Sequence, residues 1–214
     1  MGNPKGGMMN EGYMDILRSI ASSKPTPGGG SVAALSLAHA HSLSLMVARL
    51  TLAKEKWVDG HNAAETSIEI SEPGLEESIL LAISDSEAFE SVMSAYRLPK
   101  VTEIEKKKRS EEIRNATIGA ALAPLNTALS AQKLLSNLEK QSISCNPNAL
   151  TDLASASEMA LSAAKIASLN VRINLEYIDG KDVDLLTSQI ETAVAESIKS
   201  SNNVNIIVNQ RLEW

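Results

Sequence analysis

The most constraining feature of the sequence is an 18-residue stretch without a charged side chain, Ser31 to Ala48. It directly follows a turn, residues 25–30, that holds two prolines and three consecutive glycines, which do not continue a helix. The stretch itself is rich in Ala and Leu but also carries serines and two histidines, whereas a lipid-facing span would be more uniformly apolar. A helix that is free of charge and weakly polar all round is typical of the centre of a bundle. We therefore expect a central core helix here rather than a membrane span.

The composition favours an all-α fold. Ala and Ser occur 27 times each, whereas aromatic residues make up only 3% of the 214 positions. Sandwiches and barrels draw on aromatic and β-branched residues, and small residues with Leu suit closely packed helices. No strand alternation of useful length and no internal repeat is visible. The sequence predicts a multihelical bundle of long antiparallel helices around the uncharged one.

Periodicity and breakers place the other helices. Ser31 is the expected N-cap of the central helix, and Thr102 with Glu105 can form a capping box. Pro73 and Pro124 are expected to interrupt or kink their helices. The expected helices cover residues 11–22, 31–57, 61–97, 102–141, 150–178 and 182–212, the last fraying through 200–203. Residues 1–10 are Gly-rich and polar without a secretory signal, which predicts a disordered leader, and residues 11–214 are expected to form one helical domain.

Charge and cysteine content limit the classes of partner. The formal net charge is −6, which argues against a nucleic-acid binder. The sequence contains no basic amphipathic helix, which argues against a protein that binds a membrane surface. Cys145 is the single cysteine, so a disulfide framework and a Cys-rich zinc site are both excluded. A reducing cytoplasm fits this content.

The Gly-rich turn has two interpretations. Gly28, Gly29, Gly30 and Ser31 precede a helix, where free backbone N–H groups and the positive end of the helix dipole can hold a phosphate or a carboxylate. The turn is neither a Walker A loop nor a dinucleotide fingerprint, because no Gly-Lys-Ser/Thr follows and no strand precedes it. It is equally read as a tight turn that lets the central helix pack closely.

The histidines do not predict a metal site. His39 and His41 are two residues apart and point to different sides of a helix, and His61 stands alone at a helix start. No Glu-x-x-His or His-Glu-x-x-His pattern occurs. The roles of the three histidines stay open, and no metal is expected.

Two carboxylates and two amides stand out. Asp85 lies within an otherwise apolar stretch, and Asp152 lies in the first turn of a helix, where an acid also favours the dipole. Asn170 and Asn174 are one turn apart on one helix face, where a buried amide needs partners. Asp152 and Asn170 share a face but lie roughly 27 Å apart along the axis. One pocket in one subunit cannot use both, whereas an antiparallel second subunit can bring them together.

A set of short motifs follows in order along residues 14–179. The motifs are Thr26-Pro27-Gly28-Gly29-Gly30-Ser31, Met46-Val47-Ala48-Arg49-Leu50-Thr51, Lys54-Glu55-Lys56-Trp57, Asp85 to Phe89, Leu98-Pro99-Lys100, Ala123-Pro124-Leu125, Asn146, Thr151-Asp152-Leu153 and Asn170-Val171-Arg172-Ile173-Asn174-Leu175. Taken together, this ordered set resembles the formiminotransferase-cyclodeaminase and methenyltetrahydrofolate cyclohydrolase family.

The resemblance implies an all-helical homodimer in folate one-carbon metabolism, in the cytoplasm and without a cofactor beyond the tetrahydrofolate substrate. The first expected activity is the cyclodeaminase, which converts 5-formiminotetrahydrofolate to 5,10-methenyltetrahydrofolate and ammonia. The alternatives are the cyclohydrolase, which forms 10-formyltetrahydrofolate, and a non-catalytic dimeric folate-binding bundle.

The same resemblance suggests roles for the residues. Asp85 or Asp152 is expected to act as the acid–base or cation-stabilising group. Lys54, Lys56 and the Gly28–Ser31 helix terminus are expected to meet the folate carboxylates. The expected substrate-binding set is completed by Thr26, Asn170 and Asn174.

Overall fold

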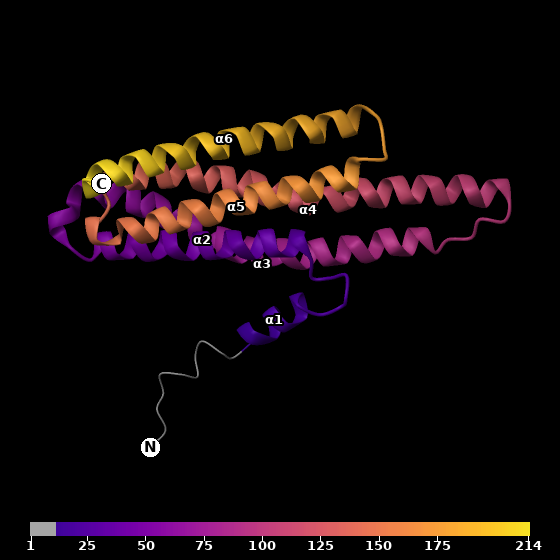
Figure 1. The fold of residues 1–214 in the computed structure, drawn as a ribbon, viewed down its shortest axis with the longest axis horizontal. Helices are drawn as coiled ribbons and strands as arrows, with labels where there is room; N and C mark the ends of the chain where they lie inside the picture. The colour runs from indigo at the N-terminus through magenta and orange to yellow at the C-terminus, as the bar shows by residue number, and fades with distance from the viewer. Residues whose placement is uncertain (1–11) are drawn as a thin grey trace, which may run out of the picture.

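The long helices run back and forth along one axis, as Figure 1 shows for the computed structural model, which describes residues 12–214. No strand occurs within that range, so the all-α prediction is confirmed. In chain order the elements are α1 (Tyr13–Ile20), α2 (Gly29–Leu52), the 3₁₀ turn η1 (Glu55–Gly60), α3 (His61–Tyr96), α4 (Glu103–Ser144), the 3₁₀ turn η2 (Pro147–Ala149), α5 (Leu150–Leu175) and α6 (Lys181–Leu212). The prediction for residues 1–10 falls outside the described residues.

Helix α2 has the central role that its lack of charge predicts. It packs against α3, α4 and α5. It is the one helix within residues 12–214 that is long and apolar enough to cross a membrane, yet 61% of its most apolar window is buried in the protein. This burial fits a core helix.

The main core is built from Leu, Ala and Val contributed by α2, α4, α5 and α6. Its large, fully buried members include Leu37 of α2, Leu134, Leu135 and Leu138 of α4, and Leu150 and Leu153 of α5. Burying one such side chain contributes about 1.5–3 kcal/mol. Alanines fill the positions between them, so the helix axes approach closely.

The two prolines do not divide their helices, so of the two predicted effects, a kink or an interruption, the interruption is wrong. Pro73 lies inside α3 and Pro124 inside α4, and each helix is a single element. A proline in a helix removes one backbone hydrogen bond, and packing along a long helix can offset that loss. Gly74, next to Pro73, serves packing instead, because a Cβ there would overlap the ring of His41.

Other boundaries differ by a few residues. Ser31 is not the N-cap, because α2 already begins at Gly29 with Gly28 as its cap. The predicted end at residue 57 is also wrong, since α2 stops at Leu52 and η1 follows. Helix α6 continues through residues 200–203 without fraying. The capping box of Thr102 and Glu105 is confirmed.

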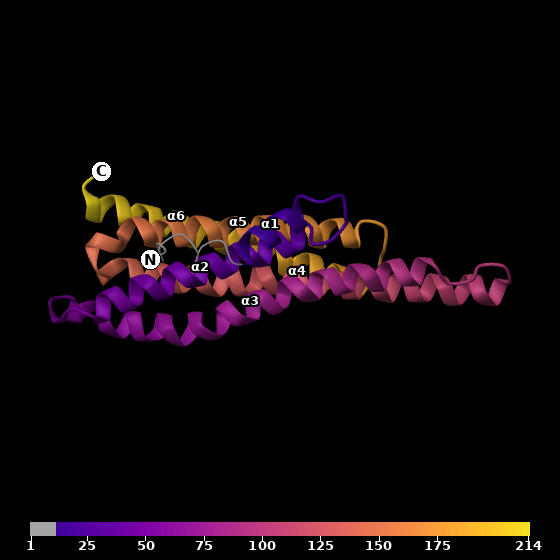
Figure 2. The same cartoon turned by 90° about the horizontal axis from the view of Figure 1, so that it is seen from below.

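Two parts extend from the bundle. The C-terminal end of α3 and the N-terminal part of α4 project beyond α5 and α6 as a two-helix arm (Figure 1). Helix α1 has no buried residue and lies on the side of the bundle where α2 runs (Figures 1 and 2). Its contact with α2 includes the Tyr13 hydroxyl, 3.3 Å from Nε2 of His39.

The buried His41 predicts a specific pH dependence of stability. Burial, with the charge of Lys133, lowers its pKa from 6.5 to about 4, and neither ring nitrogen has a hydrogen-bond partner among residues 12–214. As pH falls below 6.5, His41 becomes protonated in the unfolded chain but stays neutral in the folded chain, so the free energy of unfolding decreases. We expect His41 to account for about 3 kcal/mol of lost unfolding free energy between pH 6.5 and pH 4.

Urea unfolding of wild type and His41→Leu across this range measures the effect. The wild-type curve should fall more steeply toward pH 4 than that of the variant. His61→Gln, which changes a histidine outside the core, should keep the wild-type slope. Parallel curves for wild type and His41→Leu would contradict the assignment.

Candidate functional site

A cavity of about 300 Å³ lies where the turn before α2 meets α3, α4 and α5. It is lined by Pro25, Thr26, Gly28, Gly29, Gly30, Asp85, Phe89, Val92, Ala120, Asn170, Ile173 and Asn174. The structure therefore brings eight of the predicted site residues together. Seven of them line the cavity, and the eighth, Ser31, directly contacts Asp85. A larger hollow of about 560 Å³ on the arm, between Glu90 and Glu112, contains none of them.

The glycines of the turn allow a close approach of backbone to polar side chains. A Cβ on Gly30 would overlap the Asp85 carboxylate, and a Cβ on Gly29 would lie 3.2 Å from Nδ2 of Asn170. Larger residues would therefore push α2 away from α3 and α5. The close-packing interpretation of the turn is supported, and the close packing is against the predicted polar residues.

Ser31 connects α2 to α3. Its hydroxyl lies 2.9 Å from Oδ2 of Asp85, to which it donates, and 3.2 Å from Oγ of Ser86. Ser31 itself is 1% exposed. The hydroxyl predicted to cap α2 thus fixes the orientation of the Asp85 carboxyl instead.

Asp85 is a half-buried acid with a perturbed pKa. Burial raises the pKa of its carboxyl above the usual value, while hydrogen bonds from the hydroxyl and the backbone N–H of Ser31 oppose the shift. A carboxyl with a raised pKa in a cavity can hold and release a proton nearer to neutral pH. Such groups are candidates for functional sites.

Asn170 and Asn174 lie on the cavity side of α5. Nδ2 of Asn170 donates to the carbonyl of Ile166 at 2.9 Å, and Nδ2 of Asn174 donates to the carbonyl of Ala120 at 3.0 Å. Neither amide oxygen accepts a hydrogen bond from the part of the chain that the structure describes. Both oxygens therefore remain able to accept a hydrogen bond from a ligand.

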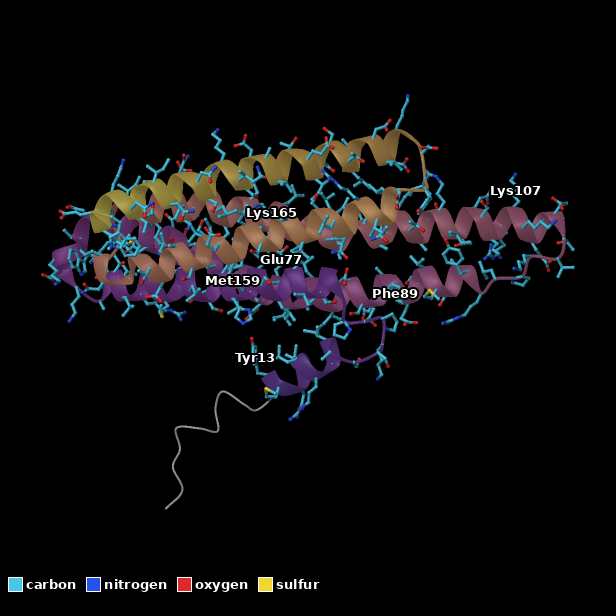
Figure 3. The ribbon with its side chains drawn as sticks, in the orientation of Figure 1. Tyr13, Glu77, Phe89, Lys107, Met159 and Lys165 are labelled. Atoms are coloured by element: carbon cyan, nitrogen blue, oxygen red, sulfur yellow. The ribbon has the colours of Figure 1, made fainter. Side chains whose placement is uncertain are left out.

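The apolar part of the lining was not predicted from the sequence. Phe89 and Val92 follow Asp85 by one and two turns of α3, and Ile173 lies between the two asparagines on α5. Figure 3 labels Phe89 on α3, beside the turn before α2. The helical spacing from Asp85 was the signal available, since residues four and seven positions further lie on the same face.

Three predicted residues lie elsewhere. Lys54 and Lys56 are exposed beyond the C-terminal end of α2, and Nζ of Lys56 lies 4.5 Å from the centroid of the Trp57 ring. Asp152 is half-buried in the first turn of α5. A hydrogen bond of 3.0 Å, from the backbone N–H of Asn146 to Oγ1 of Thr51, joins the segment before α5 to the C-terminal end of α2. Lys54, Lys56 and Asp152 thus share one end of the bundle, and the cavity lies toward the other.

The histidines and the cysteine do not form a site in the described range. His39 contacts Tyr13, His61 lies 3.3 Å from the Lys54 carbonyl, and His41 is buried. Within residues 12–214 no group of three His, Cys, Asp or Glu side chains is arranged to hold a metal ion. Cys145 is buried, and burial raises the pKa of its thiol.

The close approach at Gly30 gives a test of the site's construction. In Gly30→Ala the new methyl group would overlap the Asp85 carboxylate, so we expect the unfolding free energy to fall by roughly 1–3 kcal/mol. The matched control is Gly119→Ala on α4, where a Cβ meets nothing within 4 Å. That change should raise stability by roughly 0.5–1 kcal/mol. Equal effects of both changes in urea unfolding would refute the packing argument.

Comparison with known proteins adds relatives of two kinds. The chain is 36% identical over 173 residues to a methenyltetrahydrofolate cyclohydrolase of Methylorubrum extorquens, covering 80% of this chain and 83% of that protein. It is 26% identical over 207 residues to the formimidoyltransferase-cyclodeaminase of Gallus gallus. That match covers 97% of this chain but only 38% of the chicken protein.

A solved structure shares the fold. The crystal structure of formiminotetrahydrofolate cyclodeaminase from Thermotoga maritima superposes with a TM-score of 0.85 at 27% identity, covering 97% of this chain and 100% of that one. The sequence profile described as formiminotransferase-cyclodeaminase matches residues 13–193. Motifs, fold and relatives agree, and the chain belongs to the formiminotransferase-cyclodeaminase family.

Proposed function

We propose that this protein is a folate one-carbon enzyme that acts on the carbon between N5 and N10 of tetrahydrofolate. The first candidate activity is the cyclodeaminase, which forms 5,10-methenyltetrahydrofolate and ammonia from 5-formiminotetrahydrofolate. The observation that carries it is the cavity in which a half-buried carboxyl, Asp85, lies among amide, backbone and apolar groups. The cyclodeaminase-named structural relative supports the choice.

The reaction needs a proton to be moved within a closed site. N10 attacks the formimino carbon and forms a tetrahedral carbon that bears N5, N10 and the amino group. The N10 proton must then leave and a proton must reach the amino group, so that the carbon–nitrogen bond breaks and ammonia departs. One carboxyl can accept the first proton and deliver it to the leaving nitrogen. The product is a cation, which the resulting carboxylate stabilises.

Asp85 is the better of the two predicted carboxyls for this role. It lines the cavity, its pKa is raised by burial, and the Ser31 hydroxyl orients it. Asp152 does not line that cavity. We assign the acid–base role to Asp85 and leave Asp152 for a role at the other end of α5.

The remaining cavity groups suit binding. The amide oxygens of Asn170 and Asn174 can accept hydrogen bonds from the N–H groups of a pterin ring. Phe89, Val92 and Ile173 supply apolar surface for its faces. Thr26 and the glycines of the turn close the cavity from the α2 side.

The cyclohydrolase is the second candidate. The Methylorubrum relative of that name has the higher identity, 36% against 26–27% for the two relatives named as cyclodeaminases. That reaction adds water to the same carbon and opens the ring to 10-formyltetrahydrofolate. Asp85 would then take the proton of the attacking water, so both reactions draw on the same group.

The wider setting is part of the proposal. We expect a cytoplasmic homodimer that acts on a tetrahydrofolate derivative without a further cofactor, and that binds neither nucleic acid nor a membrane. The net charge of −6 and the single buried cysteine support this setting.

A paired absorbance assay for methenyltetrahydrofolate separates the candidates. One sample starts from 5-formiminotetrahydrofolate, where a cyclodeaminase makes the absorbance appear. The other starts from methenyltetrahydrofolate, where a cyclohydrolase makes it decay faster than in buffer. If folded protein changes neither, the enzymatic proposal fails, and a folate-induced rise in melting temperature would then identify a binder.

Asp85→Asn tests the catalytic assignment. We expect kcat to fall by about 10²–10⁴-fold, because the proton carrier is lost. Stability at neutral pH should not fall, since the change removes a buried charge and keeps an acceptor for Ser31. The stability difference should shrink as pH falls through the raised folded pKa and vanish below 3.8, where the wild-type carboxyl becomes protonated in the unfolded state as well.

The matched control is Glu87→Gln, which neutralises an exposed acid two residues further along α3. It should keep wild-type turnover. Wild-type turnover in folded Asp85→Asn would remove Asp85 from the mechanism.

A further inference from the structure

The Ser31 hydroxyl has more acceptors within reach than it has hydrogen atoms to donate. Its Oγ lies 2.9 Å from Oδ2 of Asp85 and 3.1 Å from the carbonyl oxygen of Ala82. A hydroxyl carries one donor and two acceptor lone pairs. Its single hydrogen therefore makes a well-directed bond to one of these two oxygens at a time.

Ser86 can fill a lone pair of the same hydroxyl. Its Oγ lies 3.2 Å from Oγ of Ser31, and either hydroxyl can be the donor. Ser31 is buried, so its hydroxyl depends on these protein groups rather than on water. Three groups of α3, at positions 82, 85 and 86, thus surround one hydroxyl of α2.

The protonation state of Asp85 decides which oxygen receives the Ser31 hydrogen. An ionised carboxylate is the stronger acceptor, because hydrogen bonds to charged groups are roughly twice as strong as those between neutral groups. A protonated carboxyl loses that advantage, and the carbonyl of Ala82 then competes for the hydrogen. Rotation about the Cβ–Oγ bond of Ser31 moves the hydrogen alone, so no heavy atom has to shift.

We infer that the Ser31 hydroxyl is a positioning group that changes its hydrogen-bond partner each time Asp85 takes up or releases a proton. While Asp85 is ionised, Ser31 donates to Oδ2. When Oδ2 is protonated the bond reverses: Oδ2 donates to Oγ of Ser31, and Ser31 donates to the carbonyl of Ala82. Neither state leaves the buried hydroxyl or Oδ2 without a hydrogen bond, which would be costly.

This inference rests on the proposed function, in which Asp85 changes its protonation state twice in one turnover. In the cyclodeaminase reaction the N10–H bond breaks as an O–H bond forms on Asp85. That O–H bond breaks as a new N–H bond forms on the leaving amino group, and ammonia departs. Ser31 keeps its own hydrogen throughout and changes only its partner. It is therefore a positioning residue that acts through Asp85.

No other charge takes the place of Ser31 in this arrangement. Among the described residues that line the cavity, Asp85 is the one that carries a charge, and α4 and α5 face it with alanine, asparagine and isoleucine. Lys24, beside the turn, and Glu87 of α3 are both exposed. Burial raises the pKa of the Asp85 carboxyl, and the hydrogen bonds that oppose this shift both come from Ser31.

Ser31→Ala tests the inference through the pH dependence of kcat/KM, measured by the absorbance assay with the rate in buffer subtracted. The carboxylate loses a donor, so the acid limb of the profile should move to higher pH. On that limb the variant should lose about tenfold more activity than on its plateau. A loss that is the same at every pH would show a packing role alone and would overturn the inference.

Two further variants accompany this measurement. Ser31→Thr keeps a hydroxyl at the same place and should restore the wild-type limb, whereas a folded Ser31→Thr with the profile of Ser31→Ala would contradict the inference. If the added methyl group prevents folding, the Ala82 signal described next decides alone. The control is Ser84→Ala, which removes an exposed hydroxyl directly before Asp85 and should keep the wild-type profile.

The carbonyl carbon of Ala82 gives a readout that does not depend on activity. Its NMR signal, detected through the N–H of Ile83, should titrate together with the carboxyl carbon of Asp85 in the wild type, because the Ser31 hydrogen reaches Ala82 when Asp85 is protonated. In Ser31→Ala the carboxyl should titrate at higher pH, and the Ala82 signal should stay constant. Asp85→Asn identifies the carboxyl signal by its loss.

Two results of the titration would refute the change of partner. One is an Ala82 signal that does not titrate in the wild type. The other is a signal that titrates equally in wild type and Ser31→Ala, since it would then report the field of the carboxylate alone. The titration needs no substrate, so it judges the hydroxyl separately from the proposed function, which fails only if the wild type turns over neither folate.

Discussion

Close contact between α2 and its neighbours, made possible by small residues, is the constraint on which the rest of the structure depends. Gly30 lets the start of α2 meet the Asp85 carboxylate, and Gly74 lets α3 meet the ring of His41. Alanines along α2, α4 and α5 keep the helix axes near one another between these points. Because the packing is dense, a methyl group added at either glycine would overlap the neighbouring side chain.

The same contacts place polar groups where they are costly for stability. Asp85 is half-buried with a raised pKa, and His41 is buried with both ring nitrogens unpartnered among the described residues. The large apolar core can offset such costs. At Asp85 the result is a carboxyl group that lies in a cavity, is oriented by Ser31 and is placed to transfer protons. For His41 the structure offers a packing role against Gly74 and no role at the cavity.

The candidate site is assembled from four segments distant in sequence: the turn leading into α2, the C-terminal third of α3, Ala120 of α4 and the C-terminal end of α5. The resemblance of motifs named most of its polar residues in advance, because they lie in recognisable sequence patterns. It did not name Phe89, Val92 or Ile173, since an apolar residue on a helix is normally part of a core. It also grouped Lys54 and Lys56 with the glycine turn, although the length of α2 separates them.

The sequence by itself determined the helical class, the central place of α2 and the main chain reversals, because charge patterning, glycines and prolines act locally. Local signals did not decide between a kink and a break at Pro73 and Pro124, where both helices continue, and they gave the wrong role to Ser31, whose hydroxyl bonds to Asp85 rather than capping its own helix. Helix geometry already separated Asp152 from Asn170, but only the tertiary structure decided that Asp85 of α3 shares a cavity with Asn170 and Asn174 of α5. The physical reason is that proximity across helices depends on how long antiparallel elements are aligned, which local sequence patterns do not encode.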